Sequence, residues 1–296
     1  MRRVIFGLIV CSLLLSSCAR MTLDFMVQEP SNNQAPATFN FEVGEHNCDS
    51  YSWDLGDGQT SEDSIVAHRY FLSGTYTVTL RGNRKKKFKE VKKEIFVEAP
   101  EACLVKIETP YGNMIAQLFD STPKHRDNFI KLAEEGYYDN LLFHRIIEGF
   151  MIQGGDPQSR EADMSIQLGT GGPGYQIDAE FSDQHAHVKG ALAAARIGGP
   201  ANPLKKSSGS QFYIVQGRDV DASSLAAYEA RKGVTYPESV RNQYLEQGGT
   251  PFLDQDYTVF GQVIEGLEVI DQIASVNTNP MDRPIENVSM KISVIK

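Results

Sequence analysis

Apolar and polar residues alternate over short runs in the first third of the chain, which predicts β-strands rather than helices. We expect four strands there, at residues 37–43, 49–54, 75–81 and 89–97. Turn-forming residues, notably Gly56-Asp57-Gly58, separate them. Several short strands with turns between them are typical of a β-sandwich. The pattern therefore predicts an all-β domain over residues 22–98, followed by a linker at 99–102.

The pattern of residues 103–296 predicts a second, larger domain in which strands are mixed with a few helices. Residues 103–108 and 114–119 read as the two strands of a hairpin. Capping residues and apolar spacing predict a helix from Thr122-Pro123 to just before Gly136. Three further helices are expected, at 221–232, 237–247 and 267–274.

Residues 143–157 carry the most unusual pattern in the chain. They are rich in apolar and β-branched residues, are interrupted at Gly149 and end in a Gly-Gly-Asp-Pro turn. This predicts a strand, a kink or bulge at Gly149, and a second short strand. Alternate residues of an extended chain share a face. The residues that would share one face are Arg145, Ile147, Met151 and Gln153, with Phe150 brought round by the bulge. A guanidinium, an amide and apolar bulk on one face suit a shallow groove that receives a peptide.

The amino terminus has the layout of a signal peptide over residues 1–17. Arg2-Arg3 precede an apolar run at 4–15 that is too short to span a bilayer as a mature helix. Residues 15–18, Leu-Ser-Ser-Cys, resemble the bacterial lipobox, which would make Cys18 the lipidated first residue of the mature chain. An ordinary secretory signal cut slightly later is the alternative. We therefore expect a lipid-anchored protein of the bacterial cell envelope that faces the periplasm.

Composition and charge narrow the function classes. Apolar and charged fractions of 41% and 23% argue against disorder and against a multi-pass membrane protein. Removing residues 1–17 takes away two arginines and no acidic residue, so 29 basic residues become 27 against 38 acidic ones, and the net charge changes from −9 to −11. Such an acidic chain has no basic surface suited to nucleic acid. The basic run at 84–87 falls where a hairpin turn is expected. Cys48 and Cys103 lie in different predicted domains, and their spacing leaves a disulfide open.

Several local patterns resemble metal or phosphate sites but lack a required part. Asp54 and Asp57 do not have the alternating acidic spacing of a calcium loop and suit turns instead. The glycine-rich residues 169–174 are not framed by a strand and a helix, so they form a loop rather than a phosphate cradle. His185 and His187 could share a face but have no evident third ligand, which favours a structural or surface role. We expect neither a metal nor a cofactor.

Residues 22–98 resemble the PKD repeat, an immunoglobulin-like module. The motifs that carry the resemblance are Trp53-Asp54-Leu55-Gly56-Asp57-Gly58, His68-Arg69-Tyr70 and the run from Gly74 to Leu80. Trp53 is the expected core residue. Asp57-Gly58 is expected to close a hairpin.

Residues 103–296 resemble a cyclophilin-type peptidyl-prolyl cis/trans isomerase. Four segments match in the right order, at 143–156, 190–196, 209–214 and 252–261. The resemblance implies a mostly β fold, a closed antiparallel β-barrel with a helix at each end, here interrupted by a helical insertion at about 219–249. It also implies catalysis of rotation about X–Pro bonds without a cofactor, on proline-containing polypeptides.

Carried over position by position, the resemblance implies a set of site residues. Arg145 matches the catalytic arginine, and Phe150 and Gln153 are expected to act with it. The residues that would receive the proline ring are Phe150, Met151, Tyr213 and Leu253. Those that would hold the peptide backbone are Gln153, Ala195 and Gln211, and His144 lies in the same signature segment.

Four substrate-binding positions depart from the family pattern. Arg196 stands where many members have asparagine, so one backbone contact must be remade. Tyr213 replaces the usual phenylalanine and adds a hydroxyl. Phe252 and Tyr257 stand where well-known members have tryptophan and histidine, which bears on cyclosporin binding more than on turnover.

The resemblance and the signal peptide together predict a folding assistant for exported proteins. One alternative is a module that binds proline-containing segments with little turnover, while the PKD-like domain recruits an envelope partner. Another is that the PKD-like domain serves glycan or surface adhesion. The insertion either flanks the groove and biases which substrates enter, or is a surface insertion remote from it.

Overall fold

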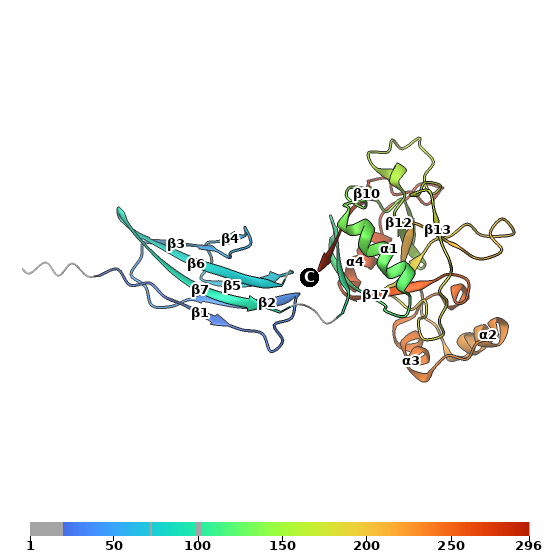
Figure 1. The fold of residues 1–296 in the computed structure, drawn as a ribbon, viewed down its shortest axis with the longest axis horizontal. Helices are drawn as coiled ribbons and strands as arrows, with labels where there is room; N and C mark the ends of the chain where they lie inside the picture. Colours follow the sequence, from blue (N-terminus) through green and yellow to red (C-terminus); the bar gives the residue numbers. More distant parts are fainter. Residues whose placement is uncertain (1–19, 72, 99–101, 296) are drawn as a thin grey trace, which may run out of the picture. The chain divides into compact units, whose positions relative to one another are not determined.

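The computed structural model describes residues 20–71, 73–98 and 102–295, and the chain divides between Glu98 and Ala99 into two compact units (Figure 1). The predicted signal peptide and Cys18 lie outside the described residues, as does most of the predicted linker. No helix within the described ranges is both long and apolar enough to cross a bilayer.

The first unit is a sandwich of two antiparallel sheets. One sheet has the order β1-β2-β5, built from β1 (Phe25–Gln28), β2 (Ala37–Val43) and β5 (Ile65–Tyr70). The other has the order β4-β3-β6-β7, built from β4 (Thr60–Ser61), β3 (Ser50–Asp54), β6 (Gly74–Arg84) and β7 (Lys87–Val97). Trp53 of β3 is only 1% exposed, and its ring lies 5.1 Å from Phe25 and 6.0 Å from Phe41 on the opposite sheet. These contacts join the two sheets and confirm the predicted sandwich.

Asp54, Asp57 and the basic run at 84–87 lie at turns between strands of this unit. The Asp54 carboxylate accepts a hydrogen bond from Gly56 N at 3.0 Å, and that of Asp57 accepts one from Gln59 N at 3.1 Å. They shape the turn between β3 and β4, at the position where Asp57-Gly58 is expected to close a hairpin. The basic run forms the turn between β6 and β7, also as predicted. Strands β1, β4 and β5 were not predicted, because β1 and β4 are very short and β5 carries polar residues on a partly buried strand.

The second unit is a strongly curled nine-stranded antiparallel sheet with the order β10-β18-β8-β9-β17-β14-β16-β12-β11. Its strands are β8 (Leu104–Thr109), β9 (Gly112–Leu118), β10 (Leu141–Leu142), β11 (Arg145–Ile147), β12 (Met151–Gly154), β14 (Ala191–Ala194), β16 (Phe212–Val215), β17 (Val259–Glu265) and β18 (Ser289–Ile295). Only Phe143 and His144 separate β10 from β11, so the two edge strands are neighbours and the sheet curls on itself as a barrel does. A small sheet pairs β13 (Gln176–Ile177) with β15 (Ser207–Ser208).

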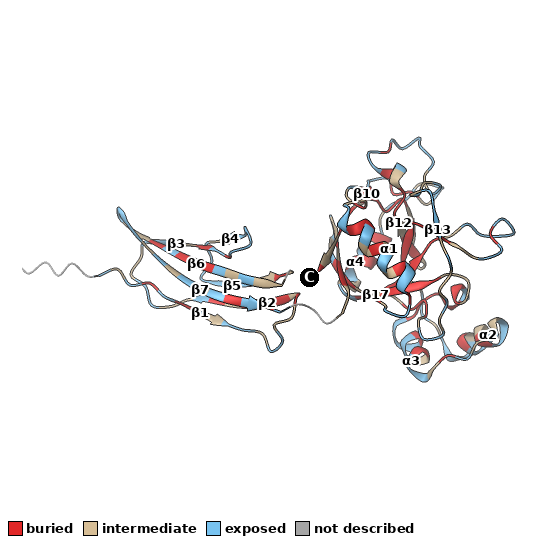
Figure 2. Cartoon of the chain, viewed as in Figure 1, coloured by how far each residue is buried: buried red, intermediate tan, exposed pale blue. Residues whose placement is uncertain are grey.

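Two helices pack on the curled sheet through their apolar faces. They are α1 (Pro123–Glu134) and α4 (Leu267–Ala274), both close to the predicted bounds. The Phe129 ring of α1 lies 5.3 Å from each of the Phe212 and Phe260 rings. In Figure 2, α1 alternates between buried and exposed residues, as expected of a helix with one face on a sheet.

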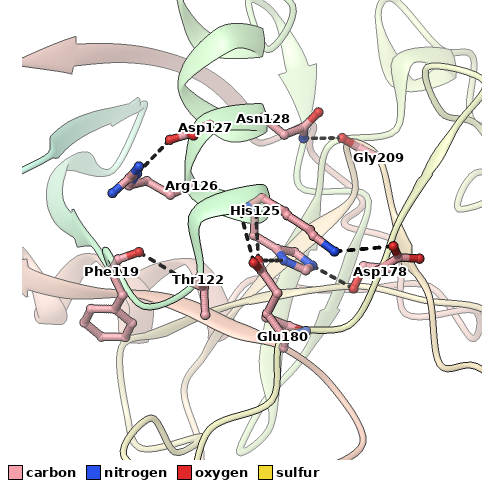
Figure 3. A network of polar contacts seen from close by, with 12 residues as sticks. Phe119, Thr122, His125, Arg126, Asp127, Asn128, Asp178, Glu180 and Gly209 are labelled. Carbon is pink, nitrogen blue, oxygen red and sulfur yellow. Dashed lines mark hydrogen bonds and ion pairs between the residues drawn. The ribbon is translucent and has the colours of Figure 1, made fainter.

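The cap of α1 comes from a distant loop rather than from the predicted Thr122, whose side chain makes no cap hydrogen bond. The Glu180 carboxylate accepts hydrogen bonds from the backbone N–H groups of Lys124 and His125, both at 3.1 Å, and from His125 Nδ1 at 2.6 Å (Figure 3). Burial lowers the pKa of His125. A carboxylate at a helix N-terminus is stabilising. This contact therefore ties the long loop before β14 to the body of the sheet.

The insertion folds as the sequence predicts, into α2 (Ala222–Lys232) and α3 (Glu238–Gln247), followed by the short 3₁₀ helix η2 (Pro251–Leu253). Asp221 caps α2, accepting hydrogen bonds from the N–H groups of Ser223 and Ser224 at 2.9 Å. Gly233 ends it with a φ of 66° that favours glycine. The helix pair packs against the segment before β14 in a small core made of Ala186, Val188, Leu225, Tyr236, Val240 and Tyr244.

Of the cysteines that the structure describes, Cys48 and Cys103, each is a free thiol, and they lie in different units.

Candidate active site

The stretch that dominates the sequence is a tight hairpin. Strands β11 and β12 pair with Arg145 opposite Gln153 and Ile147 opposite Met151. The predicted kink or bulge at Gly149 is wrong, because the structure has a hairpin turn there. Gly149 has a φ of 72° in the hairpin turn, and Phe150 N donates to Ile147 O at 3.0 Å, so the chain reverses instead of bulging onward. Arg145, Met151 and Gln153 nevertheless come together, because cross-strand partners share a face.

The hairpin forms one wall of a pocket of about 120 Å³. The residues that line the pocket are Arg145, Phe150, Met151, Gln153, Ala195, Arg196, Tyr213, Leu253 and Tyr257. Every one of them belongs to the predicted site. They come from four separate stretches of the sequence: the β11–β12 hairpin, the residues directly after β14, strand β16 and the segment after α3. The curled sheet therefore gathers the predicted residues around one small cavity.

The pocket has an apolar floor and a polar rim. Met151, Tyr213 and Leu253 are at most 9% exposed, whereas the Arg145 side chain is 43% exposed. Arg145 Nε lies 3.4 Å from Asp282 Oδ2. Gln153 Nε2 donates to Gln211 Oε1 at 3.1 Å. A cavity of this kind can enclose a small ring while guanidinium and amide groups contact the atoms beside it.

Comparison with known proteins identifies the family of the second unit. The family model for cyclophilin type peptidyl-prolyl cis-trans isomerases matches residues 104–294. The chain belongs to the cyclophilin family of peptidyl-prolyl cis-trans isomerases. The family model for PKD domains matches residues 24–97, so a PKD domain precedes the cyclophilin domain.

The relatives match 62% of the chain. A protein of Staphylococcus saprophyticus provisionally named a peptidyl-prolyl cis-trans isomerase is 39% identical over 188 residues, which is 62% of this chain and 87% of that protein. A provisionally named bifunctional phosphatase/peptidyl-prolyl cis-trans isomerase of Streptococcus pyogenes is 42% identical over 190 residues, but the match spans only 37% of that longer protein. The crystal structure of a cyclophilin type isomerase from Cryptosporidium parvum is 27% identical with a TM-score of 0.48, covering 66% of this chain and 98% of that one.

The Tyr213 wall of the cyclophilin pocket is held from behind by a buried polar chain. The Tyr213 hydroxyl lies 2.9 Å from His187 Nε2, and His187 Nδ1 lies 2.6 Å from Asp254 Oδ1. Tyr236 and Tyr244 donate to Asp254 Oδ2 at 2.5 and 2.6 Å. We call these five residues the tyrosine–histidine–aspartate network. The aspartate accepts from two tyrosines of the insertion, Tyr236 and Tyr244, so the network links the insertion to the pocket wall.

Protonation in this network follows from its partners. Burial alone raises the pKa of Asp254, but hydrogen bonds from His187, Tyr236 and Tyr244 outweigh burial and hold that pKa below its usual value. Because a carboxylate only accepts, His187 Nδ1 carries the hydrogen in that contact. Burial raises the pKa of Tyr213 well above its ordinary value, so this phenol stays protonated and donates to His187 Nε2. The hydroxyl thus points at His187, and the pocket receives the apolar ring.

Arg196, the second cation on the pocket of the cyclophilin domain, is tied to the segment after η2. Its Nε donates to Asp256 O at 2.5 Å, and its guanidinium lies 4.5 Å from the centre of the Tyr257 ring. The side chain is 10% exposed. Arg196 therefore packs against Tyr257, and these two departures from the family pattern are in direct contact.

Three predicted residues do not line the pocket. His144 is 4% exposed, and burial lowers its pKa to about 4, which leaves it neutral at pH 7. Phe252 is 41% exposed, and its ring lies 5.6 Å from that of Phe150 outside the pocket. Gln211 lies in a neighbouring groove and donates to Gly171 O at 2.8 Å.

The neighbouring groove was not foreseen. It has a volume of about 830 Å³ and shares Gln153, Ala195 and Arg196 with the pocket. Its other wall is the glycine-rich loop at 169–174, which is held by hydrogen bonds from Gly169 N and Gly171 N to the Asp156 carboxylate, at 2.5 and 3.2 Å. The loop is thus part of the candidate site, although the sequence indicated only a loop.

Sequence reasoning also missed the tyrosine–histidine–aspartate network. His187 was expected to be structural or at the surface, and the structure makes it fully buried. A sequence signal did exist, because Tyr213 adds a hydroxyl to an apolar wall and such a group requires a buried partner. The sequence could not identify that partner.

Proposed function

We propose that the pocket binds the proline ring of a polypeptide and that Arg145 lowers the barrier to rotation about the peptide bond before it. The observation that carries this proposal is the arrangement of Arg145 and Gln153 on the rim of a cavity whose floor contains Met151, Tyr213 and Leu253. An apolar floor can grip the ring while the preceding carbonyl turns. No group has to act as a nucleophile.

The reaction needs a twisted amide to bind better than either planar form. Resonance raises the rotation barrier of a peptide bond to about 18–20 kcal/mol. A hundred-thousand-fold acceleration requires about 7 kcal/mol of differential stabilisation. Hydrogen bonds from groups that are already oriented, in a partly dry site, are of the right size for this.

Arg145 suits this role for two physical reasons. Twisting restores the lone pair of the imide nitrogen, which then accepts a hydrogen bond, and a guanidinium offers permanently charged donors in a rigid plane. The ion pair of Arg145 with Asp282 is more than 40% exposed at both partners. Such a pair contributes only about 0–1 kcal/mol, so Arg145 loses little when it turns toward a substrate.

A protease-coupled isomerisation assay on a short Ala–Pro peptide tests the proposal, with residues 19–296 as the enzyme. The wild-type chain is expected to accelerate exchange, and Arg145→Ala to lose about 10²–10³-fold in kcat/KM, as when a preorganised donor is removed. Arg126→Ala is the matched control, because Arg126 pairs with Asp120 and Asp127 outside the pocket. Full activity in Arg145→Ala together with an unchanged urea midpoint contradicts the assigned role.

We further propose that the enzyme assists the folding of exported proteins while lipid-anchored at Cys18 in the bacterial cell envelope, facing the periplasm. The signal-peptide layout and the lipobox-like residues 15–18 support this. Growth with a radiolabelled fatty acid is expected to label the wild-type protein but not Cys18→Ala. Labelling of the variant, or recovery of the wild-type chain free of membranes, counts against the anchor.

The alternative, a binding module with little turnover, draws on Arg196, which is committed to Asp256 and Tyr257 rather than presented as an amide to a peptide backbone. In that case a Pro-containing peptide binds the wild-type chain, and Arg145→Ala changes neither the affinity nor the isomerisation rate. The PKD domain would then supply the partner in the envelope.

A further inference from the structure

The insertion builds a second hollow next to the proline pocket. This hollow has a volume of about 460 Å³, within the roughly 300–1,000 Å³ typical of ligand sites. We call it the insertion groove. Its lining includes Val220 and Tyr228 of the insertion, together with Phe150 of the β11–β12 turn and Pro251 and Phe252 of η2. The groove therefore exists only because α2 faces the β11–β12 turn and η2.

The insertion groove and the proline pocket share a wall. Phe150 lines both cavities, and its ring lies 5.6 Å from that of Phe252. The three residues of η2 are divided between them, with Pro251 and Phe252 on the groove and Leu253 on the pocket. A polypeptide whose proline occupies the pocket would thus meet the Phe150–Phe252 pair as its chain continues on that side.

The shared wall is held firmly in place. Asp254, directly after η2, is 4% exposed and accepts hydrogen bonds from Tyr236, Tyr244 and the His187 side chain. Its Oδ1 also accepts from His187 N at 3.0 Å. Buried hydrogen bonds therefore join the insertion to the partition between the two cavities, and the groove is formed without a bound substrate.

We propose that the insertion groove is a second substrate subsite, which binds an apolar or aromatic side chain of the polypeptide close to the proline. The occupant follows from continuity with the proline pocket and from the chemistry of the walls. Ile147, Phe150, Val220, Pro251 and Phe252 are apolar, and the charged lining residues, Arg218 and Asp219, are of opposite sign. This inference rests on the proposed binding of proline in the pocket. It makes the insertion a selector of sequence around the proline.

The test compares peptides that differ at one position. The reference is Ala-Ala-Ala-Pro-Ala-Ala, and in each of three others phenylalanine replaces an alanine either two positions before, one after or two after the proline. Isomerisation is followed by exchange between the cis and trans NMR signals. The measured quantity is the ratio of kcat/KM for a phenylalanine peptide to that for the reference, which an unfolded fraction of enzyme leaves unchanged.

The wild-type enzyme is expected to prefer phenylalanine about tenfold at a position on one side of the proline, as partial burial of one aromatic side chain predicts. In Tyr228→Ala and in Phe252→Ala the preference is expected to fall to about threefold or less. Leu245→Ala is the matched control, because Leu245 is a 46% exposed residue of α3 outside the groove. It is expected to keep the tenfold preference.

Three results overturn the subsite: no preference at any tested position in the wild type, an unchanged preference in both groove variants, or an equal loss in Leu245→Ala. Failure of the wild-type enzyme to act on the reference peptide is a different result. It contradicts the proposed function, whereas normal turnover of that peptide without a preference contradicts only the insertion groove.

Discussion

Replacing Asp254 by asparagine is expected to destabilise the cyclophilin domain and leave the PKD domain unchanged. Asp254 is almost fully buried and accepts four hydrogen bonds, two from His187 and one each from Tyr236 and Tyr244. Asparagine keeps the shape but offers one acceptor oxygen. Its amide must then face either the two tyrosine hydroxyls, which can rotate and accept, or His187 N–H, which cannot.

The expected loss can be worked from these contacts. Hydrogen bonds to a charged group contribute about 1.5–3 kcal/mol each, against about 1 kcal/mol for neutral ones. Weakening four of them, with no buried charge left behind, should cost about 3 kcal/mol, at the low end of the range for breaking a buried pair. With a urea m-value of about 3 kcal/mol/M for a domain of this size, the midpoint of unfolding should fall by about 1 M.

The chain offers separate signals for its two units. Helices α1 to α4 all lie in the cyclophilin domain, so circular dichroism at 222 nm follows that domain. The sole tryptophan, Trp53, lies in the PKD domain, so its fluorescence is an internal control. A fall of less than about 0.3 M in the helical midpoint refutes the magnitude derived from the hydrogen bonds. An equal shift in both signals shows that the change is not local to the network.

Two further predictions concern the stability of the cyclophilin domain. Tyr213→Phe leaves His187 Nε2 without its donor and should lower the free energy of unfolding by about 1–2 kcal/mol. The double variant with Asp254→Asn should lose about 1 kcal/mol less than the sum of the two single losses, because both changes affect His187. Full additivity in urea titrations counts against the network. The second concerns His144, whose pKa burial lowers from 6.5 to about 4. The unfolded chain then binds a proton that the native state does not, so stability should fall by up to about 3 kcal/mol between pH 6.5 and pH 4. Urea titrations at pH 7, 5.5 and 4.5 should show a shallower fall in His144→Gln, and equal slopes would exclude this cause.

Local sequence signals predicted the helices whose ends are set by neighbouring residues. The cap and stop signals around α2 and α3 placed these helices within a residue or two, since Asp221, Gly233 and Gly248 act on their immediate neighbours. Gly149 shows the limit of such signals. A glycine with positive φ permits both a bulge and a reversal, and the choice depends on which strand pairs with which. That is a property of the whole sheet.

In the candidate site, too, some residues could be predicted from local sequence and others could not. The pocket residues carry recognisable chemistry in recognisable segments, and the sequence suggested all nine of them. The cap that Glu180 gives to α1 and the contacts of His187 depend on residues brought together by folding. His187 lies 67 positions from Asp254 and 26 from Tyr213. A polar residue that becomes buried has no local signature, because its partner can lie anywhere in the chain.

The network also explains why Tyr213 and the helical insertion, both departures from the family pattern, occur in the same chain. A hydroxyl on the wall of an apolar pocket is costly unless it is hydrogen-bonded, so Tyr213 requires His187. The tautomer of His187 that accepts from Tyr213 requires a carboxylate at Nδ1, which Asp254 supplies. Buried so deeply, that carboxylate requires further donors, and the insertion provides them in Tyr236 and Tyr244. Each buried polar group therefore depends on the next for a hydrogen-bond partner. Deleting the insertion while retaining Tyr213 and Asp254 should destabilise the pocket more than deleting a surface loop of that length would.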